Sequence, residues 1–542
     1  MNPKTTTRWP GVPEAFVSKF GDLFTAVLSG WDRLRLCGTL RPLFNPEWMR
    51  AHLCAGKVLL KDFRGHAEGL TEQIHARALA AAAEVGRPYR FLKTSRTSKE
   101  GIARELVQRD HVRAGLVTVL GAVEPCVAMT VRLNRESGRL EPRLEDRRAL
   151  HLYHYFQHEQ FGLCHVRVQT WYPFTVEVWV NGREWLARQM DEAGIAYVRR
   201  DNCFTHLADP VRAQSLCAAQ ERADWPRLLN DLLARAHPLH PQITRPLHLD
   251  YYWTALQSEH ATDLLCRDAG TLARIYPAWV RHGLNSFGCL DIMRFLGHRV
   301  PATTGRVNGR FQAEALANYR HRPEGVRLKH WVGQNSIKVY DKAGQVLRVE
   351  TTLNAPEVFK LWLGPTQTKR KRGRGQAPKE GWRRLRRSVT DLPARAELSR
   401  AANARYLQAL AATGAGRPLG ETVAQVCAPV TWQQRRYRAL RLFAAPETAV
   451  LTLINRGDFT VEGFRNADVQ GALFISPARS TKEKRRRSSA AGRWLRLLRA
   501  HGLIRKVPGR HRYLVSEKGR ELITLVLTAQ HADVQKLSAL AA

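Results

Sequence analysis

The amino-acid sequence predicts a multidomain protein of the α+β class. At 542 residues the chain is too long for one hydrophobic core, because cores usually stop growing near ~250–300 residues. In the middle of the chain, runs rich in β-branched and aromatic residues alternate with runs of helical periodicity. Towards the C-terminal end, three helical segments are followed by a basic hairpin. We therefore expect a helical N-terminal region, a central mixed α/β module with antiparallel strands, and a C-terminal domain of helices and a hairpin.

The composition indicates a folded and strongly basic protein. Hydrophobic residues make up 44% of the chain, enough to bury a core and to exclude global disorder. The 86 Lys and Arg exceed the 48 Asp and Glu, giving a net charge of +38 and a pI near 10.6. An excess of this size predicts a polyanionic partner. A GC-rich genome, which favours arginine codons everywhere, is the alternative explanation.

Cysteine usage and the N-terminus predict the compartment. The nine cysteines are widely spaced and form no CxxC pair, which argues against a disulfide framework and against a zinc finger. The first residues, MNPKTTTRWPGVPEAF, lack the pattern of a signal peptide, and no apolar run approaches ~18–20 residues. We expect a cytoplasmic protein without a membrane partner.

Residues 1–120 are predicted to form the helical N-terminal region. An alanine-rich run, EQIHARALAAAAEV, has helical character. Thr97 and Glu100 have the spacing of a capping box, which predicts a helix over GIARELVQRD.

Residues 121–363 are predicted to form the central module. Strands are expected in PCVAMTVRLNR and in LCHVRVQTWYPFTVEVWVNG, because both are rich in β-branched and aromatic residues. A helix is expected in REWLARQMDEAG, and further helices over 251–283. Residues 342–345 lie between two alternating runs and predict a hairpin turn.

Two connecting segments are expected next. Residues 364–388 hold ten Lys and Arg among Gly, Pro and Gln, and predict an exposed basic linker. We expect its densest part to bind phosphates, through Lys369, Arg370, Lys371 and Arg372. Residues 389–440 are predicted to be a helical connector.

Residues 441–542 have the order of elements of a winged-helix domain. Helices are expected in PETAVLTLINRG, FTVEGFRNADVQGALF and STKEKRRRSSAAGRWLRLLRAHGLI, followed by a basic hairpin turning at Pro508-Gly509 and by a last helix. Ala491, Leu495 and Leu498 form a buried stripe on the third helix. The predicted DNA-contacting residues lie off this stripe or on the hairpin: Arg486, Arg493, Arg496, Arg505, Lys506, Arg510 and Arg512. A winged helix used for protein contacts is the alternative.

The segment LLRAHGLIRKVPGRHRYLVSEKGREL resembles the recognition helix, wing and following helix of bacterial winged-helix regulators of the MarR and ArsR type. The resemblance covers about 85 residues around this segment. It implies that the C-terminal domain binds duplex DNA.

A second resemblance lies in residues 335–354. Their Y-D-K and L-R-x-E strands resemble the strand pair of phage and plasmid rolling-circle replication initiators. The resemblance implies a tyrosine nucleophile, Tyr340, and a divalent metal such as Mg²⁺ or Mn²⁺ held by Glu350 or Asp341.

The paired-histidine metal motif of those initiators is absent from the sequence. His165 and Gln169 are the nearest substitutes, because alternation places them on one strand face. The alternatives are ordinary structural roles: Tyr340 as a strand aromatic, and Arg348 and Glu350 as a cross-strand ion pair.

Two further clusters are candidate sites, with an ordinary structural or surface role as the alternative. His151, His154 and His158 have the spacing of a helix face, and Glu259, His260 and Asp263 form an acidic group in the predicted helical stretch. No P-loop, Rossmann glycine pattern or GxSxG is present in the sequence, which disfavours nucleotide-driven motors and hydrolases of those kinds.

The chain as a whole resembles an uncharacterised bacterial family, through runs such as FGLCHVRVQTWYPFTVEVWVNGREWLARQ and RLLRAHGLIRKVPGRHRYL. This resemblance implies a bacterial source. From the net charge, the winged-helix pattern and the strand pair of residues 335–354 we predict a DNA-binding protein of a bacterial mobile element or replicon, with metal-dependent nicking in replication or transposition as its candidate activity. The alternatives are a non-enzymatic winged-helix regulator of transcription and an RNA-binding protein.

Overall fold

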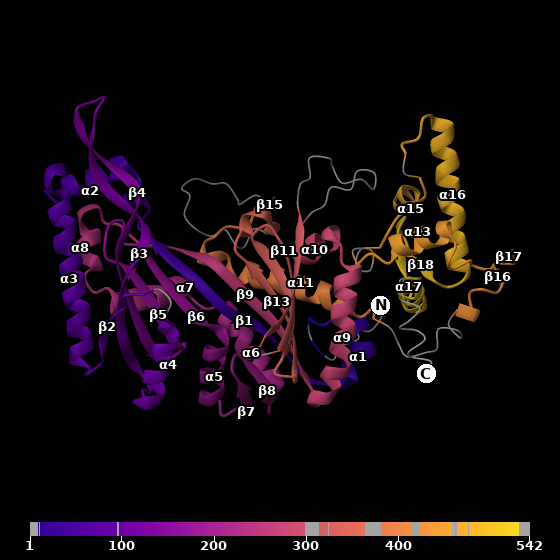
Figure 1. Ribbon diagram of the computed structural model, residues 1–542, viewed down its shortest axis with the longest axis horizontal. Coiled ribbons are helices and arrows are strands. Elements are labelled where there is room, and N and C mark those ends of the chain that lie inside the picture. Colours follow the sequence, from indigo (N-terminus) through magenta and orange to yellow (C-terminus); the bar gives the residue numbers. More distant parts are fainter. Residues whose placement is uncertain are drawn as a thin grey trace, which may run out of the picture. The chain divides into compact units, whose positions relative to one another are not determined.

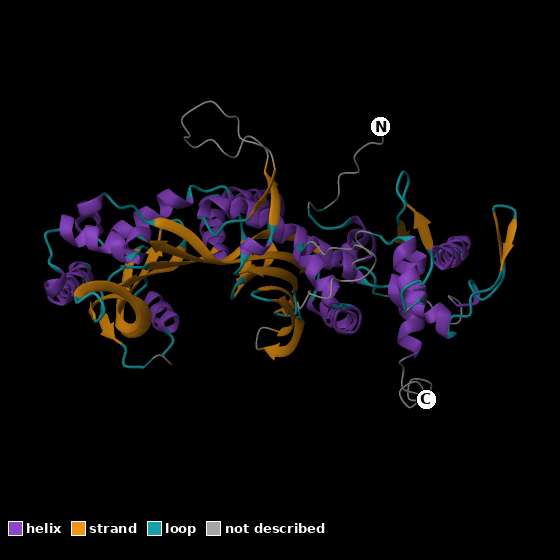
Figure 2. Cartoon of the chain, turned by 90° about the horizontal axis from the view of Figure 1, so that it is seen from above, coloured by secondary structure: helices purple, strands orange, loops and turns teal. Residues whose placement is uncertain are grey.

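The computed structural model describes residues 9, 11–94, 97–298, 314–322, 325–363, 381–413, 423–457, 459, 463–474 and 476–530. Helices and strands occur throughout these residues, so the protein is of mixed α/β type (Figure 2). The chain divides into two compact units made of interleaved segments. One contains residues 28–261 and 352–397, and the other contains 1–27, 262–351 and 398–542. This division differs from the consecutive domains that the sequence predicts.

The largest sheet has eleven strands in the order β10-β11-β12-β13-β9-β1-β6-β5-β4-β3-β2. Three neighbouring strands of this sheet are β1 (Phe24–Thr39), β9 (Tyr252–Cys266) and β13 (Val346–Leu353) (Figure 1). Each of them contributes residues to both units. β1 pairs with β6 in antiparallel register, Leu34 opposite Val180.

The unit of 28–261 and 352–397 holds most of the remaining strands. They are β2 (Tyr89–Phe91), β3 (Gly115–Asn134), β4 (Arg139–His158), β5 (Gly162–Gln169), β6 (Val176–Asn181), β7 (Tyr197–Arg200), β8 (Cys203–Leu207), β14 (Lys360–Leu363) and β15 (Gly381–Arg384). Its helices are α2 (Pro46–Ala55), α3 (Phe63–Glu84), α4 (Lys99–Arg109), α5 (Gly182–Glu192), α6 (Pro210–Glu221), α7 (Trp225–Ala236) and α8 (His240–Thr244).

Helix α7 illustrates how sequence builds this core. Asp224 accepts a hydrogen bond from the amide of Arg227 and caps the helix. Leu229, Leu232 and Leu233 recur at helical spacing and are buried against Trp31 and other residues of the same hydrophobic cluster.

The other unit contains the hairpins at one end of the strand order and all of the C-terminal elements. Its elements before residue 425 are α1 (Glu14–Phe20), α9 (Ala269–Ser286), α10 (Cys289–Leu296), β10 (Ala315–Arg322), β11 (Gly325–Val332), β12 (Asn335–Lys342) and most of α11 (Leu392–Leu410). The predicted turn between β12 and β13 is confirmed, with Ala343 and Gly344 at positive φ.

The C-terminal elements surround one hydrophobic cluster. They are β16 (Val430–Trp432), β17 (Arg435–Tyr437), α13 (Ala445–Ile454), α15 (Asn466–Leu473), α16 (Thr481–Ala500), β18 (Ile504–Lys506), β19 (Tyr513–Val515) and α17 (Glu517–Gln530). β18 pairs with β19, and an isolated antiparallel bridge joins Phe464 to Tyr513. The three helices, the hairpin and the final helix therefore lie where the sequence predicts them.

Two strands correct the sequence-based expectations. The N-terminal region predicted to be helical contains α1, α2, α3 and α4, but strand β1 runs for 16 residues through it. The stretch predicted as helix from residue 251 begins with the 15-residue strand β9. Both strands are buried on both faces, which removes the alternation of apolar and polar residues by which strands are usually recognised.

Three smaller expectations also change. The helix after residue 98 is capped by Ser98, not Thr97, through a hydrogen bond from the amide of Gly101. His151, His154 and His158 lie on strand β4 and not on a helix. The connector contains the hairpin β16–β17, and the described end of the basic linker forms β15, paired with β14 and followed by the buried Leu385.

Candidate functional site

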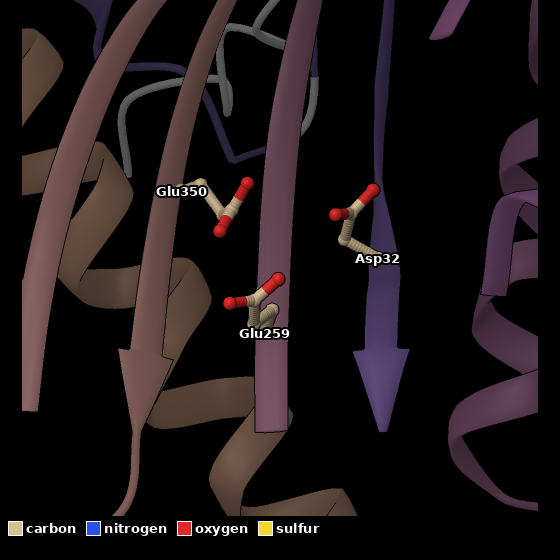
Figure 3. A group of neighbouring side chains, drawn as sticks. All are labelled: Asp32, Glu259 and Glu350. Carbon is tan, nitrogen blue, oxygen red and sulfur yellow. The ribbon is translucent and has the colours of Figure 1, made fainter. Parts of the chain in front are cut away.

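Three carboxylate side chains lie together on neighbouring strands of the largest sheet. Asp32 is on β1, Glu259 on β9 and Glu350 on β13, and these strands are consecutive in the sheet order. One carboxylate oxygen of each residue lies within 4.8 Å of the others, and the three groups point into the same space (Figure 3). Their exposed fractions are 3%, 9% and 2%. We call these residues the carboxylate cluster.

The closeness of the carboxylate cluster has an electrostatic consequence. Two ionised carboxylates at this separation repel each other by roughly 3 kcal/mol at an effective dielectric constant near ~20. Protonation, basic neighbours or a bound cation reduce that repulsion. Carboxylate oxygens are also the ligands that Mg²⁺ and Mn²⁺ prefer in proteins.

Hydrogen bonds hold two members of the cluster in place. Asp32 Oδ1 accepts a 2.7 Å hydrogen bond from Asn202 Nδ2, and Asn202 Oδ1 accepts one of 2.8 Å from Asn181. Asn181 in turn caps helix α5, so the position of Asp32 is linked to the start of that helix. Glu259 accepts a 2.9 Å hydrogen bond from Gln257.

A lysine connects the two residues predicted to be catalytic. Lys338 Nζ lies 2.5 Å from Glu350 Oε1 in a buried ion pair. Lys338 and Tyr340 are two residues apart on β12 and therefore share a face, and the ammonium group of Lys338 lies 5.6 Å from the centre of the Tyr340 ring. Lys342 lies 5.7 Å from the same ring. Tyr340 is 8% exposed.

The residues predicted as further metal ligands have other contacts. The carboxylate of Asp341 accepts a hydrogen bond from the amide of Gly344 in the hairpin turn, and burial raises its pKa. Gln169 donates to the carbonyl oxygens of Val127 and Trp171.

His165 packs between aromatic rings, among them those of Tyr155 and Trp179. Burial, reinforced by Arg167, lowers the pKa of His165 to about 3. In the part of the chain that the structure describes, the carboxylate cluster is the metal-ligand group found, and it contains neither His165 nor Asp341.

A second candidate site lies on helix α16. The predicted stripe is confirmed, because Ala491, Leu495 and Leu498 are at most 2% exposed. Arg486, Arg493 and Arg496 are exposed. None of these three arginines has an ion-pair partner among the described residues.

The hairpin after α16 is also basic. Arg505, Lys506 and Arg510 are exposed, and Arg512 is half-buried. Lys369, Arg370, Lys371 and Arg372 of the predicted basic linker lie outside the described residues.

Sequence reasoning missed Asp32 and Lys338, and it did not connect Glu259 with Glu350. Asp32 stands as a single acidic residue within the apolar run LSGWDRLRL, and such an isolated charge in a buried strand is the signal that points to it. Glu259 belongs to the acidic group that the sequence predicts on a helix, whereas it lies on strand β9. Lys338 lies on β12 and Glu350 on β13, the two strands of one hairpin. Their ion pair can be inferred only once these strands are known to lie side by side.

No protein-family model, curated protein or solved structure shows a significant match to the chain. Among the described residues, no helix combines the length and the apolar character needed to cross a membrane.

Proposed function

We propose that this chain is a DNA-binding protein whose residues 445–530 form a winged-helix domain. The proposal is supported by the order of elements, with α13, α15 and α16 followed by the β18–β19 hairpin and α17. In winged helices of this order the third helix enters the major groove and the hairpin contacts the backbone or the minor groove.

The observation that carries the proposal is the unpaired positive charge on α16. Arg486, Arg493 and Arg496 are exposed on the helix that would enter the groove, without ion-pair partners among the described residues. Arginine forks bind phosphates and guanine edges with two hydrogen bonds each. Duplex DNA therefore matches this surface in charge and in hydrogen-bonding geometry.

The test is binding of the full chain to labelled duplex DNA, single-stranded DNA and structured RNA, measured by fluorescence anisotropy at several salt concentrations. Preference for duplex DNA that is lost in an Arg493→Ala/Arg496→Ala variant supports the proposal. The matched control is Arg212→Ala, which removes an exposed arginine from helix α6. Preference for RNA would favour the RNA-binding alternative, and absence of any binding would overturn the proposal.

A second candidate function is metal-dependent cleavage of the DNA backbone, as in a nicking factor of a mobile element or replicon. It is favoured by the closeness of the three carboxylates to one another and by the position of the Lys338 ammonium group beside both Glu350 and the Tyr340 ring. Asp32, Glu259 and Glu350 would hold Mg²⁺ or Mn²⁺ through oxygen ligands. The metal would polarise the phosphate that is attacked.

In this candidate reaction the chain's own nucleophile is the Tyr340 hydroxyl. Its oxygen would bond to phosphorus while the bond from phosphorus to the 3′ oxygen breaks, leaving a 5′-phosphotyrosine and a free 3′ hydroxyl that takes up the proton. Lys338 would offset negative charge beside the ring. If water attacks instead, the carboxylate cluster would serve a hydrolytic nuclease and no adduct would form.

A denaturing gel of labelled DNA incubated with the protein, with and without Mg²⁺ or Mn²⁺, separates these possibilities. A covalent band that vanishes in Tyr340→Phe, but persists in the matched control Tyr319→Phe at an exposed tyrosine, supports the tyrosine mechanism. Cleavage retained in Tyr340→Phe and lost in Glu350→Gln supports hydrolysis. DNA binding without cleavage leaves the transcriptional regulator as the function.

A further inference from the structure

A second hairpin, which the sequence did not predict, lies beside helix α16. Strands β16 and β17 are joined by Gln433 and Gln434, both at positive φ, and Trp432 pairs with Arg435 across the turn. Two consecutive residues of this conformation form the tight turn typical of two-residue hairpins. The tip therefore presents Arg435 and Arg436, which are both exposed.

The β16–β17 hairpin is fixed to the C-terminal core at its base. Val426 and Leu440, which flank the hairpin, are buried in the same hydrophobic cluster as the stripe of α16. The amide of Leu440 donates to the carbonyl of Val426 at 3.0 Å, and His501 Nε2 lies 2.8 Å from the carbonyl oxygen of Arg438. Arg438 also pairs with the buried Glu447 at 2.9 Å.

A groove of about 400 Å³ lies between this hairpin and α16, within the size range of ligand sites. It is lined by four arginines and two aromatic residues: Arg436, Arg438, Arg493, Arg496, Tyr437 and Trp494. Its lining contains no acidic residue among those described. Three of the four arginines, all except Arg438, have no ion-pair partner in the described chain.

We infer that this groove binds the phosphodiester backbone of DNA, so that the β16–β17 hairpin acts as a second wing of the domain. The inference rests on the proposed function. Unpaired guanidinium groups gathered in one groove repel one another, and a phosphate between them replaces that repulsion with charge-assisted hydrogen bonds. The apolar rings of Tyr437 and Trp494 suit the sugar surface of a backbone strand.

Two arginines shared between the groove and the DNA-facing surface of α16 indicate that the groove binds a polymer and not a small anion. Arg493 and Arg496 belong both to the groove and to the surface of α16 proposed to face DNA. A backbone strand in the groove would therefore continue the DNA bound by the helix. Figure 1 shows the β16–β17 and β18–β19 hairpins on either side of α16, as two wings would lie.

The experiment compares Arg436→Ala with Arg435→Ala in the full chain. Both variants remove one exposed arginine from the same hairpin, but Arg436 lines the groove and Arg435 does not. Each variant is titrated onto one duplex DNA over a range of salt concentrations. We expect Arg436→Ala to lower the slope of log affinity against log salt by about 0.9, the value for one lost phosphate contact. We expect Arg435→Ala to leave the slope unchanged.

Hydroxyl-radical footprinting of the same complexes locates the contact. Loss of protection at one set of backbone positions in Arg436→Ala, different from the set lost in Arg510→Ala, supports a second wing. An Arg436→Ala variant with the wild-type slope and footprint would overturn the inference alone. Equal slope changes in both hairpin variants would also overturn it, since they indicate general charge attraction. Failure of the wild-type protein to bind duplex DNA would instead overturn the proposed function.

Discussion

The charged residues of the central strands and those of helix α16 are arranged in opposite ways. In the strands, charges are buried and some are paired: Arg348 binds Asp263 through two bonds of 2.6 and 2.9 Å, with both side chains 1% exposed. On α16, Arg493 and Arg496 are exposed and without an ion-pair partner in the described residues. Paired buried charge serves the chain's own structure or a closed site, whereas unpaired exposed charge of one sign serves an external partner.

The largest effect is expected on DNA binding, in the variant Arg493→Ala/Arg496→Ala. If both residues contact bases or phosphates, the loss should be on the order of 2–6 kcal/mol of binding free energy, at ~1–3 for each contacting residue. Anisotropy titrations against one duplex measure it, with the thermal midpoint as a control for folding. An unchanged affinity would show that α16 does not contact the DNA, and the contrast between buried structural charges and exposed binding charges would fail.

The next largest effect is expected on stability, in Arg348→Met. Removing one partner of a buried ion pair should cost about 3–5 kcal/mol, because Asp263 keeps its buried charge and loses the two hydrogen bonds from Arg348. Thermal unfolding followed by circular dichroism measures it. The double variant Asp263→Leu/Arg348→Met should recover much of the loss, because it removes both charges. An Arg348→Met midpoint equal to that of Arg493→Ala would show that the buried pair is not structural.

Buried histidines in the unit of 28–261 should make its stability depend on pH. Burial lowers the pKa of His154 to about 4 and that of His237 to about 3. Because the folded state favours the neutral rings, their full contribution to the free energy of unfolding is present above the unfolded-state pKa of ~6.5. It decreases as the pH falls toward the folded values, by up to about 1.4 kcal/mol per pH unit for each histidine.

Thermal midpoints between pH 7 and 4.5 test this pH dependence. The variant His237→Leu should flatten the decrease, and the matched control His206→Gln, at an exposed histidine, should leave it as in the wild-type protein. A decrease identical in all three proteins would assign the acid sensitivity to other groups.

The smallest effect is expected at the tip of the β18–β19 hairpin. Arg510→Ala should lower the salt slope of duplex binding by about 0.9 without changing which sequence is preferred, since a phosphate contact carries no base information. Selection of preferred sequences by wild type and variant, followed by salt titrations, checks both parts. A changed preference would place Arg510 at a base edge.

The C-terminal elements were predictable because local signals agree there. The apolar stripe, the cap at Ser480 and the turn at Pro508-Gly509 all fall where the elements begin, end or pack. The hairpin of β12 and β13 was predictable for the same reason, since Gly344 permits its turn.

The carboxylate cluster was predictable only in Glu350. Its partners Asp32 and Glu259 are brought to it by strand pairings between segments far apart in the sequence, and single-sequence patterns contain no record of such pairings. The strand β9 also resembles a helix in sequence, because Ser258, Glu259, His260 and Asp263 are polar residues buried in a strand. Such polar residues can be buried because partners distant in sequence satisfy them, as Glu221 does for His260 at 2.9 Å.

The interleaving of the two compact units sets an order for their assembly on the ribosome. Residues 28–261 leave the exit tunnel long before 352–397, which complete the same unit, and residues 1–27 are grouped with 262–351 as well as with segments beyond 398. Chains generally fold domain by domain as they emerge. Here the strands that flank β1, β6 and β9, emerge well before residues 352–397, but Val389, Leu392 and Ala396 belong to the same hydrophobic cluster as Trp31 of β1. Nascent chains therefore expose that part of the core, and offer it to chaperones, until segment 352–397 is made.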